Sequence, residues 1–513
     1  MAYTPSLVDL LAYTTLVIVI IALEKRRRQK GRVYPPGPRP LPLIGNLLDV
    51  PKEHQWFTFT EWARKYGEIV YAHVLGKTII VVSSTKAIRE LLEKRATNYS
   101  DRPVVPFFEI MEFGGLVVMD RYSPHWRLRR KMLDRTLRPN CILRYRDTIK
   151  MKVHDLLKQL LADPEEFREH LELLQGAILL SVVYGYDVDG KHDSYLQRAL
   201  AVNEIGTKVM LPGAALVNDL PFLKNLPEWL PGMGWMDLAR QGRKARHEAV
   251  TAPFKFVKDR MENGTARPSV THDNIIEVEH GDPAEVQEGE RAIAESSASL
   301  YFAGADSTSA ALASLFLALV LHPEVQTRAQ AEVDAATGGK RLPTFEDRPQ
   351  MPYVDAVCKE LLRWNLVAPS AVPHAAMEED TYNGYYIPKG AIIIANLWAI
   401  LHDPIIYPDP DSFKPNRFLP IDGVAKEEAI STLNAAFGIG RRICPGRHLV
   451  DPTVFITVAS VVASFSVSKA MDEDGNEIPV TPAYSGGVLS HPMPFKCSIV
   501  PRVGKEALIL APS

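Results

Sequence analysis

The segment from Glu290 to Val325 constrains the fold of this 513-residue chain more than any other. It contains no proline before Pro323, and from Leu300 onward it is apolar on nearly every side. This pattern predicts one long helix through the centre of a protein, about 50 Å in length at 1.5 Å per residue. A membrane-spanning helix is the alternative, but Asp306 and the serines around it would be costly in lipid. We therefore expect a buried helix.

The rest of the chain predicts a mainly α fold with small β-sheets. Most segments have helical periodicity, and two β-rich runs occur at 69–84 and 382–400. The polar stretch 266–288, which holds two prolines, is expected to be an exposed connection. No break in composition divides residues 46–513, so we expect a single large domain. The 59 Lys and Arg residues balance the 61 Asp and Glu residues, which argues against a nucleic-acid partner.

Residues 1–30 predict an N-terminal membrane anchor with a basic flank. Residues 7–23 are seventeen largely apolar residues, near the lower limit for a spanning helix, and the basic sequence EKRRRQKGR follows them. Positive charge on that side places the body of the protein in the cytoplasm. A cleaved signal peptide is the alternative, but the basic segment that would precede its apolar core is missing. Residues 31–45, with five prolines, predict a stiff hinge.

The sequence AGADSTS interrupts the expected central helix with polar residues. Gly304 allows another group to approach the backbone, and serine or threonine hydroxyls can bond back into the helix and open a groove. Packing of small residues against a second helix would explain the alanines and Gly304. It does not explain Asp306, so we predict that this carboxylate handles protons.

Two helical motifs contain polar side chains that are expected to act together. In CKELLRWN, Glu360 and Arg363 lie three residues apart on one helical face, and Arg417 follows in FKPNRF as a third member of a buried network. In HWRLRRK, Trp126 and Arg130 project from one face and could bind a carboxylate. Each motif taken alone also fits an ordinary solvent-exposed helix.

The sequence FGIGRRICPGRHLV surrounds Cys444 with residues that a packing cysteine does not need. Gly438 and Gly440 predict a tight loop, and Pro445 and Gly446 predict a turn into a helix, so that backbone N–H groups and the helix dipole would stabilise a thiolate. A thiolate there could be a nucleophile, a zinc ligand or an iron ligand. No oxyanion-binding arrangement is evident and no second cysteine has matching spacing, whereas axial ligation of haem iron needs one thiolate only.

With this cysteine loop, the chain resembles the cytochrome P-450 family, and specifically its membrane-anchored fungal members. The family signature Phe-x-x-Gly-x-Arg-x-Cys-x-Gly is matched at every fixed position by Phe437, Gly440, Arg442, Cys444 and Gly446. The resemblance extends from the anchor to the sequence HPMPFKCSIVPR near the C-terminus. It implies the cytochrome P-450 fold, with a long central helix over haem b, for a haem-thiolate domain of residues 46–513.

The resemblance also implies roles for residues at matching positions. Cys444 would be the axial ligand of the haem iron, with Phe437, Gly440 and Gly446 forming its loop. The haem propionates would be held by Trp126, Arg130, His374 and Arg442. Glu360, Arg363 and Arg417 would support the cysteine loop. Asp306, Ser307 and Thr308 would relay protons, although Ser307 stands where the family usually has threonine, which puts the coupling of oxygen use to product in doubt.

Substrate contacts are expected from the segments that surround the distal face of the haem in this family. We expect the pocket to be lined by Phe107, Phe108, Val117, Phe302, Ala303, Val367, Val372 and Leu489. These residues are apolar, so a lipophilic, mainly neutral substrate is expected, with a fungal secondary metabolite such as a terpenoid as the leading candidate.

The resemblance implies a monooxygenase of the endoplasmic reticulum membrane, single-pass, with a cytoplasmic catalytic domain. Electrons would come from NADPH through a membrane-bound NADPH-cytochrome reductase, with cytochrome b5 as a second candidate partner besides membrane lipid and the substrate. Arg127, Arg129, Lys131 and Arg441 are expected on the surface that attracts an acidic reductase. Two alternatives remain open: a haem-thiolate isomerase or dehydratase that uses neither oxygen nor NADPH, and a non-catalytic membrane-anchored binding protein.

Overall fold

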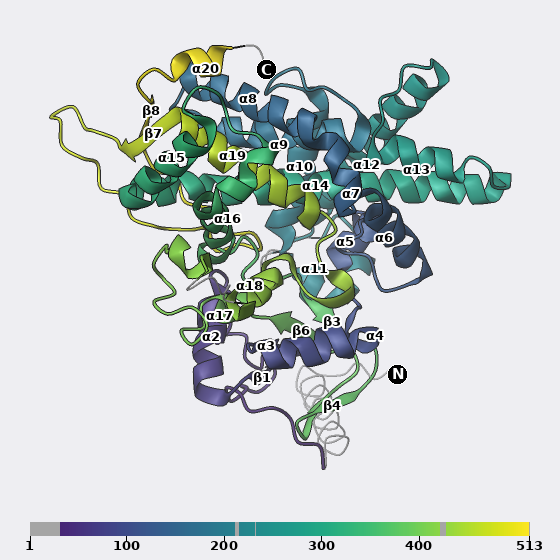
Figure 1. Cartoon of the computed structure of the whole chain (residues 1–513). Helices are drawn as coiled ribbons and strands as arrows, with labels where there is room; N and C mark the ends of the chain where they lie inside the picture. The colour runs from purple at the N-terminus through teal and green to yellow at the C-terminus, as the bar shows by residue number, and fades with distance from the viewer. Residues whose placement is uncertain (1–30, 211–214, 231, 421–426, 512–513) are drawn as a thin grey trace, which may run out of the picture.

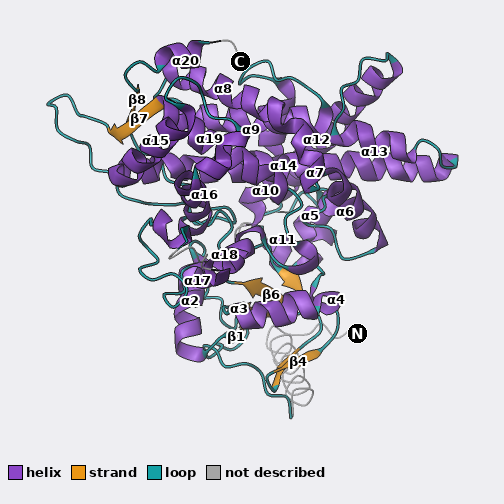
Figure 2. Cartoon of the chain, in the orientation of Figure 1, coloured by secondary structure: helices purple, strands orange, loops and turns teal. Residues whose placement is uncertain are grey.

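A computed structural model describes residues 31–210, 215–230, 232–420 and 427–511, and the predicted anchor at 1–30 lies outside them. Long helices make up one large part of the molecule, and a small sheet with short helices makes up the other (Figure 1). Strands occur in this sheet region and in one two-stranded sheet beside the helical part (Figure 2). The fold is mainly helical with small sheets, as the sequence predicts.

Helices cover most of the chain, and the longest lie near the middle of the sequence. The α-helices are α2 Gln55–Tyr66, α3 Thr85–Ile88, α4 Ala96–Tyr99, α5 Pro106–Ile110, α6 Pro124–Thr136, α7 Pro139–Ile142, α8 Arg146–Ala162, α9 Phe167–Tyr184, α10 Ser194–Met210, α11 Leu216–Asp219, α12 Trp235–Glu262, α13 Val270–Val278, α14 Pro283–Leu321, α15 Pro323–Thr337, α16 Pro352–Trp364, α17 Leu397–Leu401, α18 Glu427–Leu433, α19 Arg447–Ser464 and α20 Glu506–Leu510.

The strands are short and form one four-stranded sheet, β1-β2-β6-β3, and two antiparallel two-stranded sheets, β4-β5 and β7-β8. They are β1 Ile69–Val74, β2 Lys77–Val82, β3 His374–Ala375, β4 Asp380–Tyr382, β5 Tyr385–Ile387, β6 Ile392–Ala395, β7 Phe465–Lys469 and β8 Cys497–Pro501. Both predicted β-rich runs therefore contain strands, although the end of the second run forms α17.

The predicted central helix is α14, which begins seven residues earlier than the sequence pattern indicates. Asp282 caps its first turn by accepting hydrogen bonds from Ala284 N and Glu285 N, and Pro283 occupies the first helical position. Among the described residues it is the one helix long and apolar enough to cross a membrane, but 78% of its most apolar window is buried inside the protein. The prediction of a buried helix is confirmed.

The expected exposed connection at 266–288 is wrong, because α13 lies within it. Ser269 Oγ accepts a hydrogen bond from His272 N and caps the helix, whose residues Val270 and Ile275 are buried. The two prolines, Pro268 and Pro283, mark the starts of helices rather than a loop.

The four-stranded sheet has the order β1-β2-β6-β3 and helps to position the site. Strand β6 runs parallel to β2 and antiparallel to β3, where His374 lies opposite Ile393. An isolated bridge joins Asp101 to Ala375. This bridge places the segment with Arg102 beside the segment with His374.

Candidate active site

The loop before α19 presents Cys444 at the wall of a cavity. Cys444 N donates to Phe437 O at 2.7 Å, which closes the loop. Gly440 has a φ of 65° and lies so close to Leu92 O that a Cβ atom there would overlap it. Gly438 also has a positive φ, of 81°, whereas a Cβ atom on Gly446, at the N-cap of α19, would meet the Cys444 sulfur and Leu300 at ordinary contact distances. The geometry therefore requires the first two glycines of the loop, and the third is not excluded from carrying a side chain.

Opposing effects act on the Cys444 thiol. Burial raises its pKa overall, whereas the N–H groups of Gly446 and Arg447 and the guanidinium groups of Arg130 and Arg447 lower it. A metal ion that coordinates a thiol deprotonates it outright. Within the described residues, no group of three or more His, Cys, Asp or Glu side chains is placed to hold a metal ion together.

Cys444 shares its cavity, of about 290 Å³, with side chains from many parts of the fold. Five of the eight residues predicted to contact substrate line it: Val117, Ala303, Val367, Val372 and Leu489. Most of the other lining side chains are also apolar, among them Leu300, Ile178, Leu179 and Leu366. The cavity therefore favours an apolar ligand.

The structure places the other three predicted contacts outside the cavity lining. Phe107 is fully buried and its ring lies 6.1 Å from that of Trp235. Phe108 stacks on Phe113 at 5.2 Å. Phe302 is buried beside Tyr301. These aromatic rings stabilise the helices around the cavity, because each is packed against another ring of the core.

Basic side chains from separate segments meet at the same cavity. Arg130 of α6, His374 of β3 and Arg442 of the cysteine loop all line it, together with Trp126. Trp126 Nε1 and Arg442 Nη1 both donate to Val117 O at 3.1 Å, and the Arg442 guanidinium lies over the Trp126 ring. The structure thus brings together the four residues that the resemblance assigns to the propionates.

Arg102 is a further member of this cluster that the sequence analysis missed. It is 4% exposed and donates to the backbone oxygens of Val118, Val372 and Pro373. Burial, and then the charge of Arg442, lower the pKa of Arg102 well below its usual range. No signal in a single sequence distinguishes this arginine from those on the surface.

Arg130 of this cluster pairs with the Asp134 carboxylate at 2.9 Å, but two other arginines of the cluster have no ion pair within the described residues. Burial lowers the pKa of Arg442 to about 10, and its guanidinium donates to the backbone oxygens of Ser100, Val117 and Asp120. In the described part of the chain, neither Arg102 nor Arg442 forms a salt bridge with a carboxylate. Buried cations of this kind call for an anionic partner.

His374 completes the basic end with a defined tautomer. Its Nδ1 donates to Tyr99 O at 2.7 Å, which leaves Nε2 free to face another group. Burial, followed by the charge of Arg102, lowers the pKa of His374 well below its usual range. The Cys444 thiol at the cavity wall and this basic end fit haem b, whose iron takes one thiolate and whose two propionates are anionic.

The polar residues of α14 lie on two sides of that helix. Ser307 and Thr308 line the cavity, and Ser307 Oγ donates to Ala303 O at 2.8 Å, the bond back into the helix that the sequence predicts. Asp306 does not line the cavity. Its carboxylate pairs with His491 Nε2 at 3.2 Å, and both side chains are partly exposed.

The Glu360 network is enclosed on all sides. Arg363 Nε and Arg417 Nε donate to the Glu360 carboxylate at 2.8 and 3.0 Å, and Lys414 N donates to it at 2.7 Å. Glu360 and Arg363 are 0% exposed. The remaining guanidinium N–H groups donate to backbone oxygens of the segment 401–412. The three predicted residues therefore form one unit.

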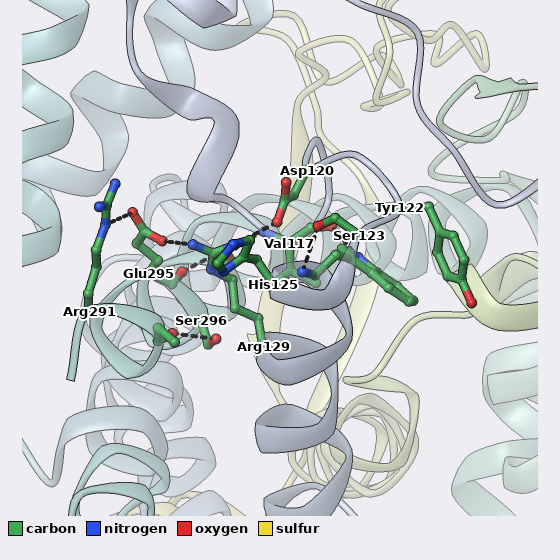
Figure 3. A network of polar contacts seen from close by, with 12 residues as sticks. Val117, Asp120, Tyr122, Ser123, His125, Arg129, Arg291, Glu295 and Ser296 are labelled. Atoms are coloured by element: carbon green, nitrogen blue, oxygen red, sulfur yellow. Dashed lines mark hydrogen bonds and ion pairs between the residues drawn. The ribbon is translucent and has the colours of Figure 1, made fainter. Parts of the chain in front are cut away.

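A second buried carboxylate, Glu295 of α14, holds the loop that carries Val117. Arg129 donates to both Glu295 and Asp120, and Arg291 approaches the other oxygen of Glu295 (Figure 3). Arg246 of α12 also donates to Glu295 at 3.3 Å. Ser299 Oγ accepts from Val117 N at 2.8 Å, so the loop is attached to α14 at two levels.

This network corrects one expectation about the surface. Arg129 was expected to face a reductase, but it is 6% exposed and its charge is taken up by Asp120 and Glu295. Residues three or four apart share a helical face, so Arg129 points inward beside Arg130 and Trp126, whereas Arg127, Lys131 and Arg441 are exposed.

Comparisons with known proteins agree with this geometry. A family model described as cytochrome P-450 matches residues 35–499. The chain is 39% identical over 476 residues to cytochrome P-450 monooxygenase COX2 of Coprinopsis cinerea, covering 93% of this chain and 90% of that protein. It is 38% identical over 502 residues to the monooxygenase claR of Ampulloclitocybe clavipes, covering 97% and 92%. Monooxygenase 208 of Postia placenta is 37% identical over 503 residues, covering 97% and 96%.

Proposed function

Because this chain belongs to the cytochrome P-450 family and is a haem-thiolate monooxygenase, we propose that it inserts one oxygen atom from molecular oxygen into a lipophilic, neutral small molecule. The observation that supports this substrate class is the cavity beside Cys444, whose walls are apolar away from the basic cluster. A ligand without charge would enter it with little loss of hydration, whereas an ion would leave its hydration shell without a partner.

When bound, haem b supplies the activation of molecular oxygen. Cys444 would ligate the iron, and Trp126, Arg130, His374 and Arg442, joined by Arg102, would hold the propionates. The Glu360 network, which joins α16 to the segment with Arg417, would support the cysteine loop. On α14, the Asp306 carboxylate would exchange protons with His491, and the Thr308 hydroxyl would present a proton at the cavity wall. Apolar side chains such as Leu300 and Val367 would exclude bulk water.

The substrate that we propose is a secondary metabolite such as a terpenoid, which the enzyme would hydroxylate. The relatives named above are fungal monooxygenases, and their names give no substrate, so this assignment rests on the apolar cavity. No feature of the described residues favours an isomerase, a dehydratase or a binding protein over the monooxygenase.

The first experiment is the carbon monoxide difference spectrum of the reduced, membrane-expressed protein beside Cys444→Ala. A strongly red-shifted Soret band in the parent and its absence in the variant would establish thiolate ligation by Cys444. Terpene hydrocarbons are then supplied with the reductase, NADPH and isotopically labelled oxygen gas. A product that carries one labelled oxygen atom is expected. Conversion of charged fatty acids alone would contradict the substrate class.

We further propose that electrons come from NADPH through NADPH-cytochrome reductase, with cytochrome b5 as an auxiliary donor. Arg127, Lys131 and Arg441 are exposed and positively charged, which suits an acidic partner. The double variant Arg127→Glu/Lys131→Glu should slow reduction and weaken its dependence on salt. Lys389→Glu, which alters an exposed ion pair with Glu378 in the turn between β5 and β6, is the control. Unchanged kinetics in the double variant would exclude this docking surface.

For localisation we propose residues 1–30 as a single-pass anchor in the endoplasmic reticulum membrane, 31–45 as a hinge and 46–513 as the cytoplasmic catalytic domain. The support is the apolar run at 7–23 with its basic flank. Deletion of residues 2–30 should move the protein from the membrane fraction toward the soluble fraction. An unchanged distribution would show that other surfaces hold it at the membrane.

A further inference from the structure

Gln175 of α9 is a buried amide that the protein leaves without a partner. It is 3% exposed and lines the cavity, yet Nε2 has no hydrogen-bond partner among the described residues. Gln326 of α15 shows the usual solution, because both its amide atoms pair with the backbone of Val467 at 2.8 and 3.0 Å. An unpaired buried amide is unfavourable, so a group in the cavity is expected to satisfy Gln175.

The packing of α9 against α14 identifies the neighbour of Gln175. The helices run antiparallel, because Phe167 lies against Phe316 at one end, with ring centroids 5.0 Å apart, and Tyr184 lies near Tyr301 at the other. Between these ends, Leu179 packs so closely on Gly304 that a Cβ there would lie 2.9 Å from the leucine.

Gln175 lies four residues before Leu179 on α9, and Thr308 lies four residues after Gly304 on α14. Because the helices are antiparallel, both residues lie about one turn from the Leu179–Gly304 contact in the same direction, and so at the same level. Both side chains line the cavity. The Ser307 hydroxyl is already engaged with Ala303 O, whereas the Thr308 hydroxyl forms no hydrogen bond within the described part of the chain. The seam between the two helices therefore brings an amide and a hydroxyl, both without a hydrogen-bond partner among the described residues, to the wall of one cavity.

Charged groups of both helices lie near one another beside this seam. Glu172, three residues before Gln175 on α9, has its pKa raised by burial and then by the nearby Asp306 carboxylate. Asp306 pairs with His491, and Arg168 and His491 oppose the shift at Glu172. Partly exposed groups that can carry protons therefore lie within one helical turn of Gln175 and Thr308 along their helices.

We propose that Gln175 positions a water molecule, shared with Thr308, that passes protons from the Asp306–His491 pair to the cavity. This inference rests on the proposed monooxygenase function. A glutamine suits the task because its amide donates through Nε2 and accepts through Oε1 without changing charge. The water accepts a proton on its Asp306 side and gives one to the Thr308 side, so it is unchanged after each transfer. A buried water of this kind needs two to four polar partners, and the seam offers them.

The test compares Gln175→Leu with Gln326→Leu as a matched control, in the full chain with bound haem. Gln326→Leu breaks two hydrogen bonds and should lower the midpoint of thermal unfolding without affecting oxygen use. Gln175→Leu breaks no bond within the protein and should unfold at the parent's temperature or above. Loss of stability in Gln175→Leu as large as in the control would contradict an unpaired amide.

Oxygen use is then measured with NADPH and the reductase in the absence of added substrate. Two electrons and two protons convert molecular oxygen to hydrogen peroxide, whereas four of each convert it to two waters. With proton delivery impaired, Gln175→Leu should release at least twofold more peroxide per NADPH, and Gln175→Glu, which still holds a water, should return the value toward the parent's. An unchanged peroxide yield in Gln175→Leu would overturn the proposal.

Two further measurements separate the explanations. A crystal structure of the haem-bound parent should show one water within hydrogen-bond distance of the Gln175 amide and the Thr308 hydroxyl, and an empty site would overturn the proposal. If Gln175→Leu weakens binding of farnesol but not of the hydrocarbon farnesene, the amide binds substrate instead. Absence of the carbon monoxide difference band in the parent would reject the proposed function itself, whereas a retained band with no effect of Gln175→Leu would reject this inference alone.

Discussion

Glu360 and Glu295 are both buried carboxylates that accept hydrogen bonds from guanidinium groups, but their surroundings differ. Around Glu360, most N–H groups of Arg363 and Arg417 that do not bind the carboxylate donate to backbone oxygens, and both arginines are at least 93% buried. Around Glu295, the Nε groups of Arg129 and Arg246 are buried and have no partner in the described ranges of the chain, and the Arg291 side chain is 70% exposed.

The difference indicates what each network does. Glu360 joins α16 to the segment 401–417 in one arrangement, since nearly every donor is satisfied. Glu295 joins α14, α6 and α12 to the loop with Val117. Because its hydrogen bonding is incomplete, movement of this loop away from α14 is less costly. We therefore expect the Glu360 network to be rigid, and we call it the fixed frame. The Glu295 network, which holds the cavity wall at Val117, is expected to move more easily.

Glu360→Gln gives the largest expected effect. Two buried guanidinium groups would lose their carboxylate, which destabilises a protein by about 3–5 kcal/mol. The free energy of unfolding should fall by that amount, and less protein should show the carbon monoxide difference band. Glu378→Gln, which removes an exposed ion pair with Lys389, is the control and should cost less than about 1 kcal/mol. A Glu360→Gln protein as stable as the control would refute the idea of a fixed frame.

Sequence separation decides how much of this could be predicted. Glu360 and Arg363 are three residues apart on one helix, and the cysteine loop is a continuous motif, so both were visible as patterns. Arg129 and Glu295 are 166 residues apart, and only the packing of α6 against α14 brings them together. Gln175 likewise depends on the register of α9 and α14. The helix α13 was missed because proline and serine mark helix starts as well as loops.

Glu295→Gln should have a smaller effect on stability, about 1–3 kcal/mol. Arg129 keeps its contact with Asp120 and Arg291 can reach water, so Arg246 alone is left without a charge partner. The loop with Val117 should loosen, and the rate of imidazole binding to the haem-bound protein, followed by stopped-flow spectroscopy, should rise severalfold. Glu290→Gln, on the same helix with Lys258 as partner, is the control.

Two results would change the comparison of the networks. If Glu295→Gln destabilises the protein as much as Glu360→Gln does, the Glu295 and Glu360 networks are equally rigid. An unchanged rate of imidazole binding would show that Glu295 stabilises the helices without controlling entry to the cavity. Each measurement is made at one pH and salt concentration, because both alter buried ion pairs.

The smallest expected effect concerns His402, which lies near the guanidinium groups of Arg363 and Arg417 in the Glu360 network. Its ring stacks on Trp398, and burial, followed by the charges of Arg363 and Arg417, lowers the pKa of His402 from 6.5 to about 3. Below pH 6.5 the unfolded chain therefore binds a proton that the folded protein does not. The neutral form of His402 therefore contributes to the free energy of unfolding, and this contribution is fully present above pH 6.5. It is lost as the pH falls toward 3, by at most about 1.4 kcal/mol per pH unit, and by less because the ring is partly exposed.

His402→Gln removes this titration and sharpens the comparison of the two networks. The free energies of unfolding of parent and variant are measured at pH 7.5, 6.5 and 5.5. The parent should lose more stability than the variant between pH 6.5 and 5.5, and the two should change in parallel above pH 6.5. Equal slopes at every pH would mean that neither burial nor the charges of Arg363 and Arg417 lower the pKa of His402 in the folded protein. A steeper slope in the parent would show that the surroundings of the Glu360 network exclude protonation of this histidine.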